Sequence, residues 1–247
     1  MPTQDASQVL QGQVAIVVGA SSGMGRATAM ALTQAGAHVI AAARRIDRLD
    51  ELAKPARSAT GTIETCQVDT TNSADVERMI DGASQRTGRI DLLVYAAGTN
   101  LPERGLPVLT LQSWQHLIET NLTGAFLCTR AVLPLMRAAQ NGLIVYLSSA
   151  CVQMPDVSGV AYQASKHGMV GLAHGTRIEE KANGIRTSVI FPGLCDTEIL
   201  NQRPVPTPRN VLDLALAPED VADAVLFLAG LPPRAVVPEL QILPSRL

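Results

Sequence analysis

The sequence predicts an α/β fold: a doubly wound parallel β-sheet with helices on both faces. Two observations support this prediction. Short apolar runs, typical of strands buried on both faces, alternate along the chain with longer Ala- and Leu-rich segments typical of helices. Hydrophobic residues make up 47% of the 247 residues, enough for a large core, and no linker or fixed-period repeat divides them. We therefore predict one domain over residues 1–247.

The first half of the chain contains three predicted strands, each followed by a helix. The strands are Val14–Gly19, His38–Ala43 and Thr62–Val68, and the helices are Met24–Ala35, Ile46–Ser58 and Ser73–Arg86. Pro55 is a weak point of the second helix, and Ser73 is expected to cap the third. This alternation indicates parallel pairing of the strands.

The second half continues the alternation and brings the predicted sheet to seven strands. The strands are Leu92–Ala96, Leu143–Leu147, Arg186–Phe191 and Leu240–Leu243, and the helices are Leu111–Asn121, Ala125–Ala139, Val160–Lys181 and Val221–Ala229. We expect a bend or interruption near Pro134. The one long irregular stretch, Gly193–Pro208, is predicted to be a substrate lid, and residues 1–12 a flexible polar leader.

Composition and charge argue against several classes of function. The 20 Lys and Arg against 22 Asp and Glu give a net charge of −2, which argues against nucleic-acid binding. No apolar run approaches the roughly 18 residues that span a bilayer, and no signal peptide is visible, so we expect no membrane partner. The four cysteines and four histidines are scattered. We therefore predict no metal site and a cytoplasmic location.

A glycine-rich turn follows the first predicted strand and opens the first helix. Its glycines let the backbone approach a pyrophosphate, and the helix N-terminus offers free N–H groups. The alternative is an ordinary strand-to-helix turn, but the position after the first strand favours a dinucleotide site. The predicted contacts are Gly19, Ser21, Ser22, Gly23, Met24 and Gly25.

The end of the second strand favours NADP(H) over NAD(H). Ala43 supplies no acid for a ribose hydroxyl, whereas Arg44 and Arg45 suit a 2′-phosphate. The alternative for the two arginines is a solvated charge pair on a loop. Asp69, just after the third strand, is a candidate acceptor for the adenine amino group, although a turn or capping role is equally compatible with its position.

Tyr162 and Lys166 lie four residues apart, on one face of a predicted helix. A nearby ammonium would lower the pKa of the tyrosine and make it an acid/base for an alcohol oxygen. The alternative is ordinary surface amphipathicity. Ser148 and Ser149 follow a strand, where the loops of an open parallel sheet carry ligand contacts, although turn chemistry is the other reading of such a pair.

Taken together, these motifs resemble those of the short-chain dehydrogenase/reductase family, whose members have a Rossmann fold. The similarity extends from about Gln13 to Ala229. The shared motifs, in order, are Gly19-x-x-x-Gly23-x-Gly25, Asp69, Ala97-Gly98, Asn121, Ser149, Tyr162-x-x-x-Lys166 and Pro192-Gly193 followed by Thr197.

The resemblance implies a role for each matching residue. Tyr162 would be the catalytic acid/base, Ser149 would bind the substrate oxygen, and Lys166 would lower the tyrosine pKa and hold the nicotinamide ribose. Asn121 would hold a water that links the lysine to solvent. Further cofactor contacts would come from Ala97, Gly98, Pro192, Gly193 and Thr197.

Three positions depart from the family pattern. Val18 replaces a common threonine, and the segment Tyr95–Gly98 replaces Asn-Asn-Ala-Gly, which removes side-chain amides that brace the sheet. The segment Pro238–Leu247 lacks a glycine-rich ending. It resembles instead the ending of some NADP-dependent reductases and hydroxy-acid dehydrogenases.

The expected function is NADP(H)-dependent hydride transfer between an alcohol and a ketone or aldehyde. The alternatives are a non-catalytic NADP(H)-binding redox sensor and a dehydratase or epimerase of the same family. The partners would be a small carbonyl or alcohol substrate and further copies of the chain in a homo-oligomer, a tetramer or a dimer. The segments Tyr95–Gly105, Pro155–Val160 and the lid would select the substrate.

Overall fold

A parallel sheet forms the centre of the computed structural model, which describes residues 9–55 and 59–247. Seven strands in this part of the chain lie in the order β3-β2-β1-β4-β5-β6-β7, and all neighbouring pairs are parallel. They are β1 (Val14–Val18), β2 (His38–Ala43), β3 (Thr62–Gln67), β4 (Leu92–Tyr95), β5 (Gly142–Leu147), β6 (Ile185–Pro192) and β7 (Glu239–Ile242). The order reverses between β1 and β4, so the predicted doubly wound Rossmann fold is confirmed.

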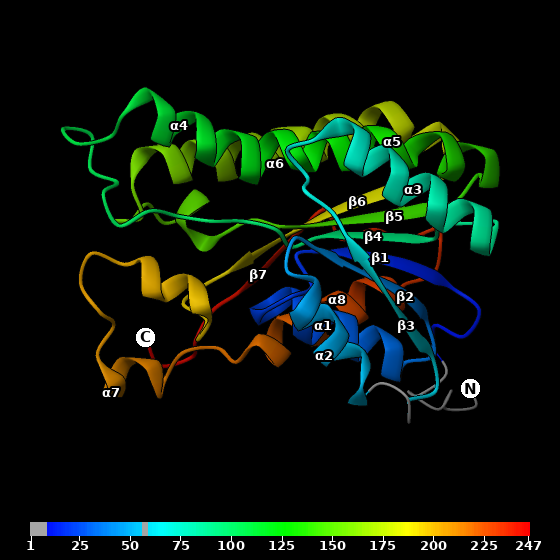
Figure 1. Cartoon of the computed structure of the whole chain (residues 1–247), viewed down its shortest axis with the longest axis horizontal. Coiled ribbons are helices and arrows are strands. Elements are labelled where there is room, and N and C mark those ends of the chain that lie inside the picture. Colours follow the sequence, from blue (N-terminus) through cyan, green and yellow to red (C-terminus); the bar gives the residue numbers. More distant parts are fainter. Residues whose placement is uncertain (1–8, 56–58) are drawn as a thin grey trace.

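Helices cover both faces of the sheet (Figure 1). One face carries α3 (Ser73–Thr87), α4 (Leu111–Ile118), α5 (Gly124–Ala139) and α6 (Val160–Glu180). The other face carries α1 (Gly23–Gln34), α2 (Ile46–Ala53) and α8 (Pro218–Ala229), and a short α7 (Arg209–Leu212) follows the segment predicted as a lid. None of the helices in the described ranges is long and apolar enough to cross a membrane.

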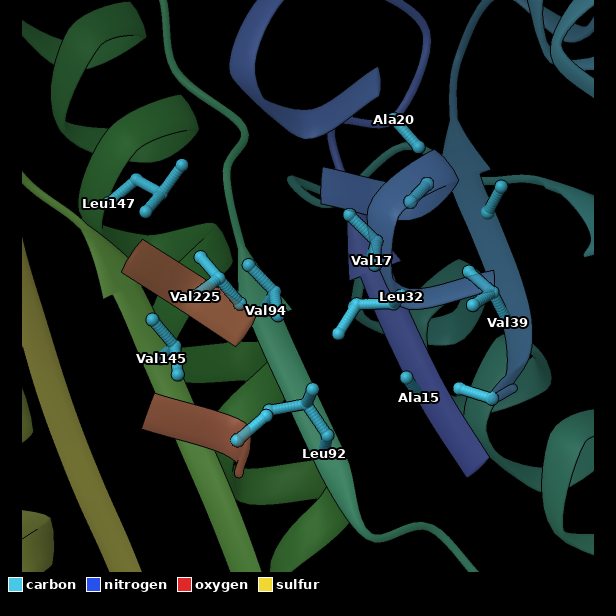
Figure 2. Packing of buried hydrophobic residues seen from close by; sticks show 14 of the residues in the cluster. Ala15, Val17, Ala20, Leu32, Val39, Leu92, Val94, Val145, Leu147 and Val225 are labelled. Atoms are coloured by element: carbon cyan, nitrogen blue, oxygen red, sulfur yellow. The ribbon is translucent and has the colours of Figure 1, made fainter. Parts of the chain in front are cut away.

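Strand β1 shows how the sheet separates two hydrophobic cores. Ala15 and Val17 pack in one core with Leu32 of α1 and Val225 of α8 (Figure 2). Ile16 points to the opposite face and packs in the second core, beneath α3, α5 and α6. All of β1 is buried, which explains why its sequence is continuously apolar and does not alternate.

The N-terminus of α3 differs from the prediction by one residue. Asn72, not Ser73, is the cap: its side-chain oxygen accepts hydrogen bonds from the backbone nitrogens of Ala74 (3.0 Å) and Asp75 (3.4 Å). Both residue types are good caps, and the extended backbone falls on the asparagine. Ser73 is therefore the first helical residue.

In the helical segment from α4 to α5, the structure shows no interruption at Pro134, one of the two predicted alternatives. Helix α5 runs through Pro134 without interruption. A proline ring is compatible with helical φ, and its main cost is the missing N–H and crowding of the preceding turn. The irregular point lies earlier, where Glu119–Thr123 form a π-helical turn (η3) between the two helices. Such turns are frequent at functional sites.

Two other predicted segments extend into residues whose structure is outside the described ranges. The predicted end of the second helix falls on residues 56–58, and α2 ends at Ala53. Residues 1–8 of the predicted leader lie outside as well, whereas Leu10 is buried and its backbone nitrogen donates to the carbonyl of Ala35 (2.9 Å).

The lid segment, Gly193–Pro208, contains a 3-10 turn, η6 (Glu198–Gln202).

Tyr95, which replaces an asparagine of the family pattern, braces the sheet itself. The side chain is fully buried, and its hydroxyl donates to the backbone carbonyl of Thr120 in the π-helical turn (2.7 Å). The same hydroxyl lies 3.3 Å from Oγ1 of Thr70 in the loop after β3. A phenol thus joins β4 to two neighbouring segments, although the family amides are missing.

We predict that Tyr95→Phe lowers the free energy of unfolding by about 1–2 kcal/mol, because it removes buried hydrogen bonds at constant ring packing. Urea unfolding measures this loss. Tyr146→Phe is the matched control, since its buried hydroxyl contacts Oγ1 of Thr129 in α5 (2.7 Å). Both variants should lose stability, but only Tyr95→Phe should speed amide exchange in Glu119–Thr123. Unchanged stability of Tyr95→Phe would contradict this role.

Candidate active site

A cavity of about 770 Å³ opens where the carboxyl ends of the parallel strands meet. Its wall comes from the turn after β1, the ends of β2, β4, β5 and β6, helix α6 and the lid segment. The predicted site residues that line it are Gly19, Ser21, Ser22, Gly23, Met24, Gly25, Arg44, Arg45, Asp69, Ala97, Gly98, Ser149, Tyr162, Lys166, Pro192, Gly193 and Thr197. Asn121 is fully buried behind this wall.

The glycine turn packs too closely for side chains. Gly19 has φ of +87°, and a Cβ there would lie 2.6 Å from the backbone nitrogen of Ala97. A Cβ on Gly25 would overlap the carbonyl of Gly19. The turn therefore brings β1, α1 and the end of β4 into direct backbone contact.

The start of α1 fits a phosphate group. Its N-cap residue, Ser22, makes no side-chain hydrogen bond to the first turn, so these N–H groups are not capped by it. Gly23 leaves space between the start of α1 and Thr197, because a Cβ at this position would lie 3.0 Å from Cγ2 of Thr197. Free amides, a positive helix end and a small-residue cradle match the pyrophosphate of a dinucleotide.

Arg44 and Arg45 have different surroundings. Arg45 donates to Oγ of Ser21 (3.0 Å) and Ser22 (2.8 Å), and it forms an ion pair with Glu198 of η6 (3.2 Å). In the described ranges the Arg44 guanidinium has no ion pair, and only its backbone carbonyl is engaged, by Gln67. Arg44 is thus the guanidinium that remains available to a ligand at the end of β2.

Asp69 lies at the edge of the same cavity. Its carboxylate accepts hydrogen bonds from the backbone nitrogen (3.0 Å) and hydroxyl (2.8 Å) of Thr71. The backbone bond is the main reason why the pKa of Asp69 lies below its ordinary value, and the charge of Arg44 acts in the same direction. These contacts hold a turn together, and the residue also faces the ligand space.

Tyr162 and Ser149 meet inside the cavity. The Ser149 side chain and the charge of Arg104 both act to lower the pKa of Tyr162. Burial opposes both and is the largest effect, so the pKa of Tyr162 in the free protein is raised above its ordinary value. In this state the pKa of Tyr162 is therefore raised by burial, and the lowering expected from Lys166 is not found.

Lys166 is buried, and its ammonium donates to the carbonyl of Leu147 at the end of β5 (2.8 Å). The nitrogen lies 5.7 Å from the centre of the Tyr162 ring. Burial lowers the pKa of Lys166 to about 8. A lysine in this state can both donate hydrogen bonds and release a proton near neutral pH.

Asn121 lies in the π-helical turn, and all its polar atoms are engaged. Its amide nitrogen donates to Oγ of Ser165 (3.0 Å) and the carbonyl of Thr99 (3.0 Å), and its oxygen accepts from the Thr99 nitrogen (2.8 Å). Asn121 therefore ties the loop after β4 to helix α6, one residue before Lys166.

Sequence reasoning did not single out three charged residues that line the cavity, Asp156, Glu198 and Arg203. Arg104 also lines it; this residue lies in the segment Tyr95–Gly105 that was expected to select the substrate, and it is 9% exposed. No local pattern announces these residues, because they come from loops distant in sequence and meet only through the fold.

A model of the short chain dehydrogenase family matches residues 13–205 of this chain. The chain belongs to this family and is one of its oxidoreductases. The fold and the motif residues around the cavity agree with that assignment.

Individual relatives extend over almost the whole chain. Cis-4-hydroxycyclohexanecarboxylate dehydrogenase of Sinomonas cyclohexanicum is 33% identical, covering 88% of this chain and 89% of its own length. A 3-oxoacyl-[acyl-carrier-protein] reductase of Thermotoga maritima is 32% identical over 90% of this chain and 92% of its own.

Solved structures show the same architecture. A metagenomic short-chain oxidoreductase in complex with NADP superimposes with a TM-score of 0.84 at 32% identity, covering 96% of this chain and 99% of that protein. An alcohol dehydrogenase of Thermococcus sibiricus, complexed with 5-hydroxy-NADP, gives 0.86 at 27% identity, covering 95% and 97%.

The pKa of Lys166 predicts a pH dependence of stability. Between about pH 8 and 10.5, its value in the folded protein and its ordinary value, the unfolded chain binds a proton that the folded protein does not. The contribution of Lys166 to the free energy of unfolding therefore rises with pH in this window, by up to a few kcal/mol at about 1.4 kcal/mol per pKa unit.

The test compares the parent with Lys166→Met by urea unfolding at several pH values in that window. The parent-minus-variant difference in unfolding free energy should increase with pH, and subtraction cancels the other titrating groups. Lys181→Met, which removes an exposed lysine, is the control. A difference that stays constant would show that Lys166 titrates normally.

Proposed function

We propose that this oxidoreductase interconverts an alcohol and a ketone or aldehyde with NADP(H), using Tyr162 as the acid/base. The observation that carries the proposal is the meeting of Tyr162 with Ser149 in a cavity that also holds Lys166 and the open start of α1. The relatives' names support the reaction class, since one acts on a hydroxy compound and another on an oxo group.

The cofactor assignment rests on Arg44 and on the glycine cradle. The first turn of α1 would hold the pyrophosphate, and Arg44 would pair with the 2′-phosphate. Two solved relatives carry NADP or a derivative of it. Asp69 would contact the adenine, and Lys166, Pro192 and Thr197 would lie along the nicotinamide half. When bound, the nicotinamide would supply or accept the hydride.

Each side chain would have a defined task. In the reduction direction Tyr162 donates its proton to the substrate oxygen, and Ser149 holds that oxygen by a hydrogen bond. The Lys166 ammonium stabilises the resulting phenolate. Because burial strongly disfavours a phenolate in the free protein, the ammonium must offset that penalty when the site is assembled. Asn121 acts through structure, holding the loop after β4 against α6.

We also propose a homo-oligomer, a tetramer or a dimer, in the cytoplasm. Exposed apolar side chains on the helical faces support an assembly: Leu111 and Trp114 on α4, Phe126 on α5 and Phe227 on α8. All four cysteines are free, which fits a reducing compartment. Sedimentation velocity at micromolar concentration should give a species larger than a monomer, and a monomer would overturn the assembly.

We predict that Tyr162→Phe loses at least about two decades of turnover, because positioned acid/base catalysis contributes about 10²–10⁴-fold. NADPH binding, followed by fluorescence titration, should change little. A cofactor-coupled screen of aldehydes, ketones, sugars and hydroxy acids supplies the substrate. Tyr146→Phe, which removes a buried hydroxyl outside the cavity, is the control.

Near-parent turnover of Tyr162→Phe would refute the mechanism. NADPH binding with no turnover of any carbonyl would instead favour a redox sensor. Turnover without net cofactor oxidation would favour a dehydratase or epimerase.

We predict that Arg44→Ser weakens NADPH binding about ten- to a hundredfold and leaves NADH binding nearly unchanged. A charge-assisted hydrogen bond to phosphate contributes about 1.5–3 kcal/mol, which corresponds to that range. Fluorescence titration of both cofactors measures the effect. Arg78→Ser, an exposed arginine on α3 that does not line the cavity, controls for lost positive charge. Equal affinities of the parent for NADPH and NADH would refute the assignment.

A further inference from the structure

Two arginines from different elements line the cavity. Arg104 lies in the loop between β4 and α4, and Arg203 follows η6 in the lid segment. Each is close enough to matter electrostatically, since the charge of Arg203 lowers the pKa of Arg104 in addition to the larger effect of burial. Both guanidiniums therefore border the same cavity.

Among the residues that the structure describes, no hydrogen-bond or ion-pair partner of the Arg104 guanidinium is found. The residue is 9% exposed, and its Nε is buried without a hydrogen bond. No ion pair to Arg104 or Arg203 occurs within residues 9–55 and 59–247, and Arg203 donates only to Oγ1 of Thr207 (3.0 Å). Buried donors in native proteins almost always have a partner, so the missing partner of Arg104 points to a ligand.

The acidic residues near this pair do not neutralise it. Asp156 acts on the pKa of Arg104, but it is exposed and not within ion-pair distance, and its Oδ1 accepts from the backbone nitrogen of Ser158 (2.9 Å). Glu198, the acidic residue of the lid turn, is instead paired with Arg45 and Arg48. Neither acidic residue is therefore paired with Arg104 or Arg203 in the part of the chain that the structure describes.

The loop that carries Arg104 is fixed to the start of α6, close to Tyr162. Gly159 has φ of +93°, and a Cβ there would lie 2.8 Å from Cβ of Arg104. The side chain of Asn100 donates to the carbonyl of Ser158 (3.0 Å). These contacts set the distance between the guanidinium and the tyrosine, whose pKa responds to the charge of Arg104.

We propose that Arg104 and Arg203 bind an oxyanion of the substrate, a carboxylate or a phosphate ester, a few atoms from the reacting carbon. The preferred substrates are then hydroxy or oxo acids, or phosphorylated hydroxy ketones. A guanidinium presents paired N–H groups that match both kinds of oxyanion. The claim that a nearby carbon reacts rests on the function proposed above, whereas the claim that the two arginines bind an anion does not.

The test compares charged and neutral forms of the same ketone. The probes are 4-oxocyclohexanecarboxylate with its ethyl ester, and dihydroxyacetone phosphate with dihydroxyacetone. NADPH-coupled kcat/KM should favour the charged member of one pair by about ten- to a hundredfold, the range of one charge-assisted hydrogen bond. Which pair shows the preference distinguishes a carboxylate from a phosphate.

Arg104→Gln and Arg203→Gln should each reduce that charged-over-neutral ratio, and Arg104→Lys should retain part of it. Arg209→Gln in α7 is the matched control, because Arg209 is exposed, pairs with Asp213 and does not line the cavity. Calorimetry with the carboxylate and the phosphate ester, with and without NADP⁺, measures binding independently of turnover. If Arg104→Gln does not fold, as judged by circular dichroism, Arg203→Gln gives the answer.

The outcomes separate the two proposals. A lower charged-over-neutral ratio of kcat/KM in the folded arginine variants supports the anion site. Equal kcat/KM for charged and neutral ketones in the parent, or an unchanged ratio in the variants, overturns it and leaves the proposed function standing. Binding of the anion without turnover, weakened by Arg104→Gln, supports the anion site and overturns the proposed function. If no ketone is turned over and calorimetry detects neither anion, both proposals fail.

Discussion

Close backbone packing at the glycine turn is the constraint on which the functional architecture depends. With no Cβ at Gly19 or Gly25, the end of β1 can touch both α1 and the segment after β4. A parallel sheet already directs the carboxyl ends of its strands to one edge. The glycines then let the backbones of neighbouring segments touch at that edge. As a result, residues from well-separated parts of the chain enclose one cavity.

Burial dominates the electrostatics of that cavity. It raises the pKa of Tyr162, lowers that of Lys166 to about 8 and lowers that of Arg104. In each case desolvation disfavours the charged form, and only specific neighbours act against it. The site of the free protein therefore holds groups away from their ordinary protonation equilibria, which is typical of functional positions.

Sequence reasoning recovered what is encoded locally. Buried apolar runs gave the strands, and the parallel topology brought the predicted residues to one cavity, with Asn121 just behind it. It failed where the outcome depends on tertiary contacts. The Arg45–Glu198 pair joins residues 153 apart, Arg104 packs against the distant Gly159, and the π-helical turn has no sequence signature. At α3 two adjacent capping residues competed, and local rules could not choose between them.

The phenol of Tyr95 also has an evolutionary consequence. A Cβ on Gly124, the first residue of α5, would overlap the Tyr95 hydroxyl and lie 2.8 Å from Oγ1 of Thr70. The phenol therefore occupies the space that a side chain at position 124 would need. Positions 95 and 124 should covary among related sequences: a tyrosine at 95 favours glycine at 124, whereas alanine at 124 requires both a smaller residue at 95 and a shift of Thr70. An alignment that treats these two columns as independent would misjudge both substitutions.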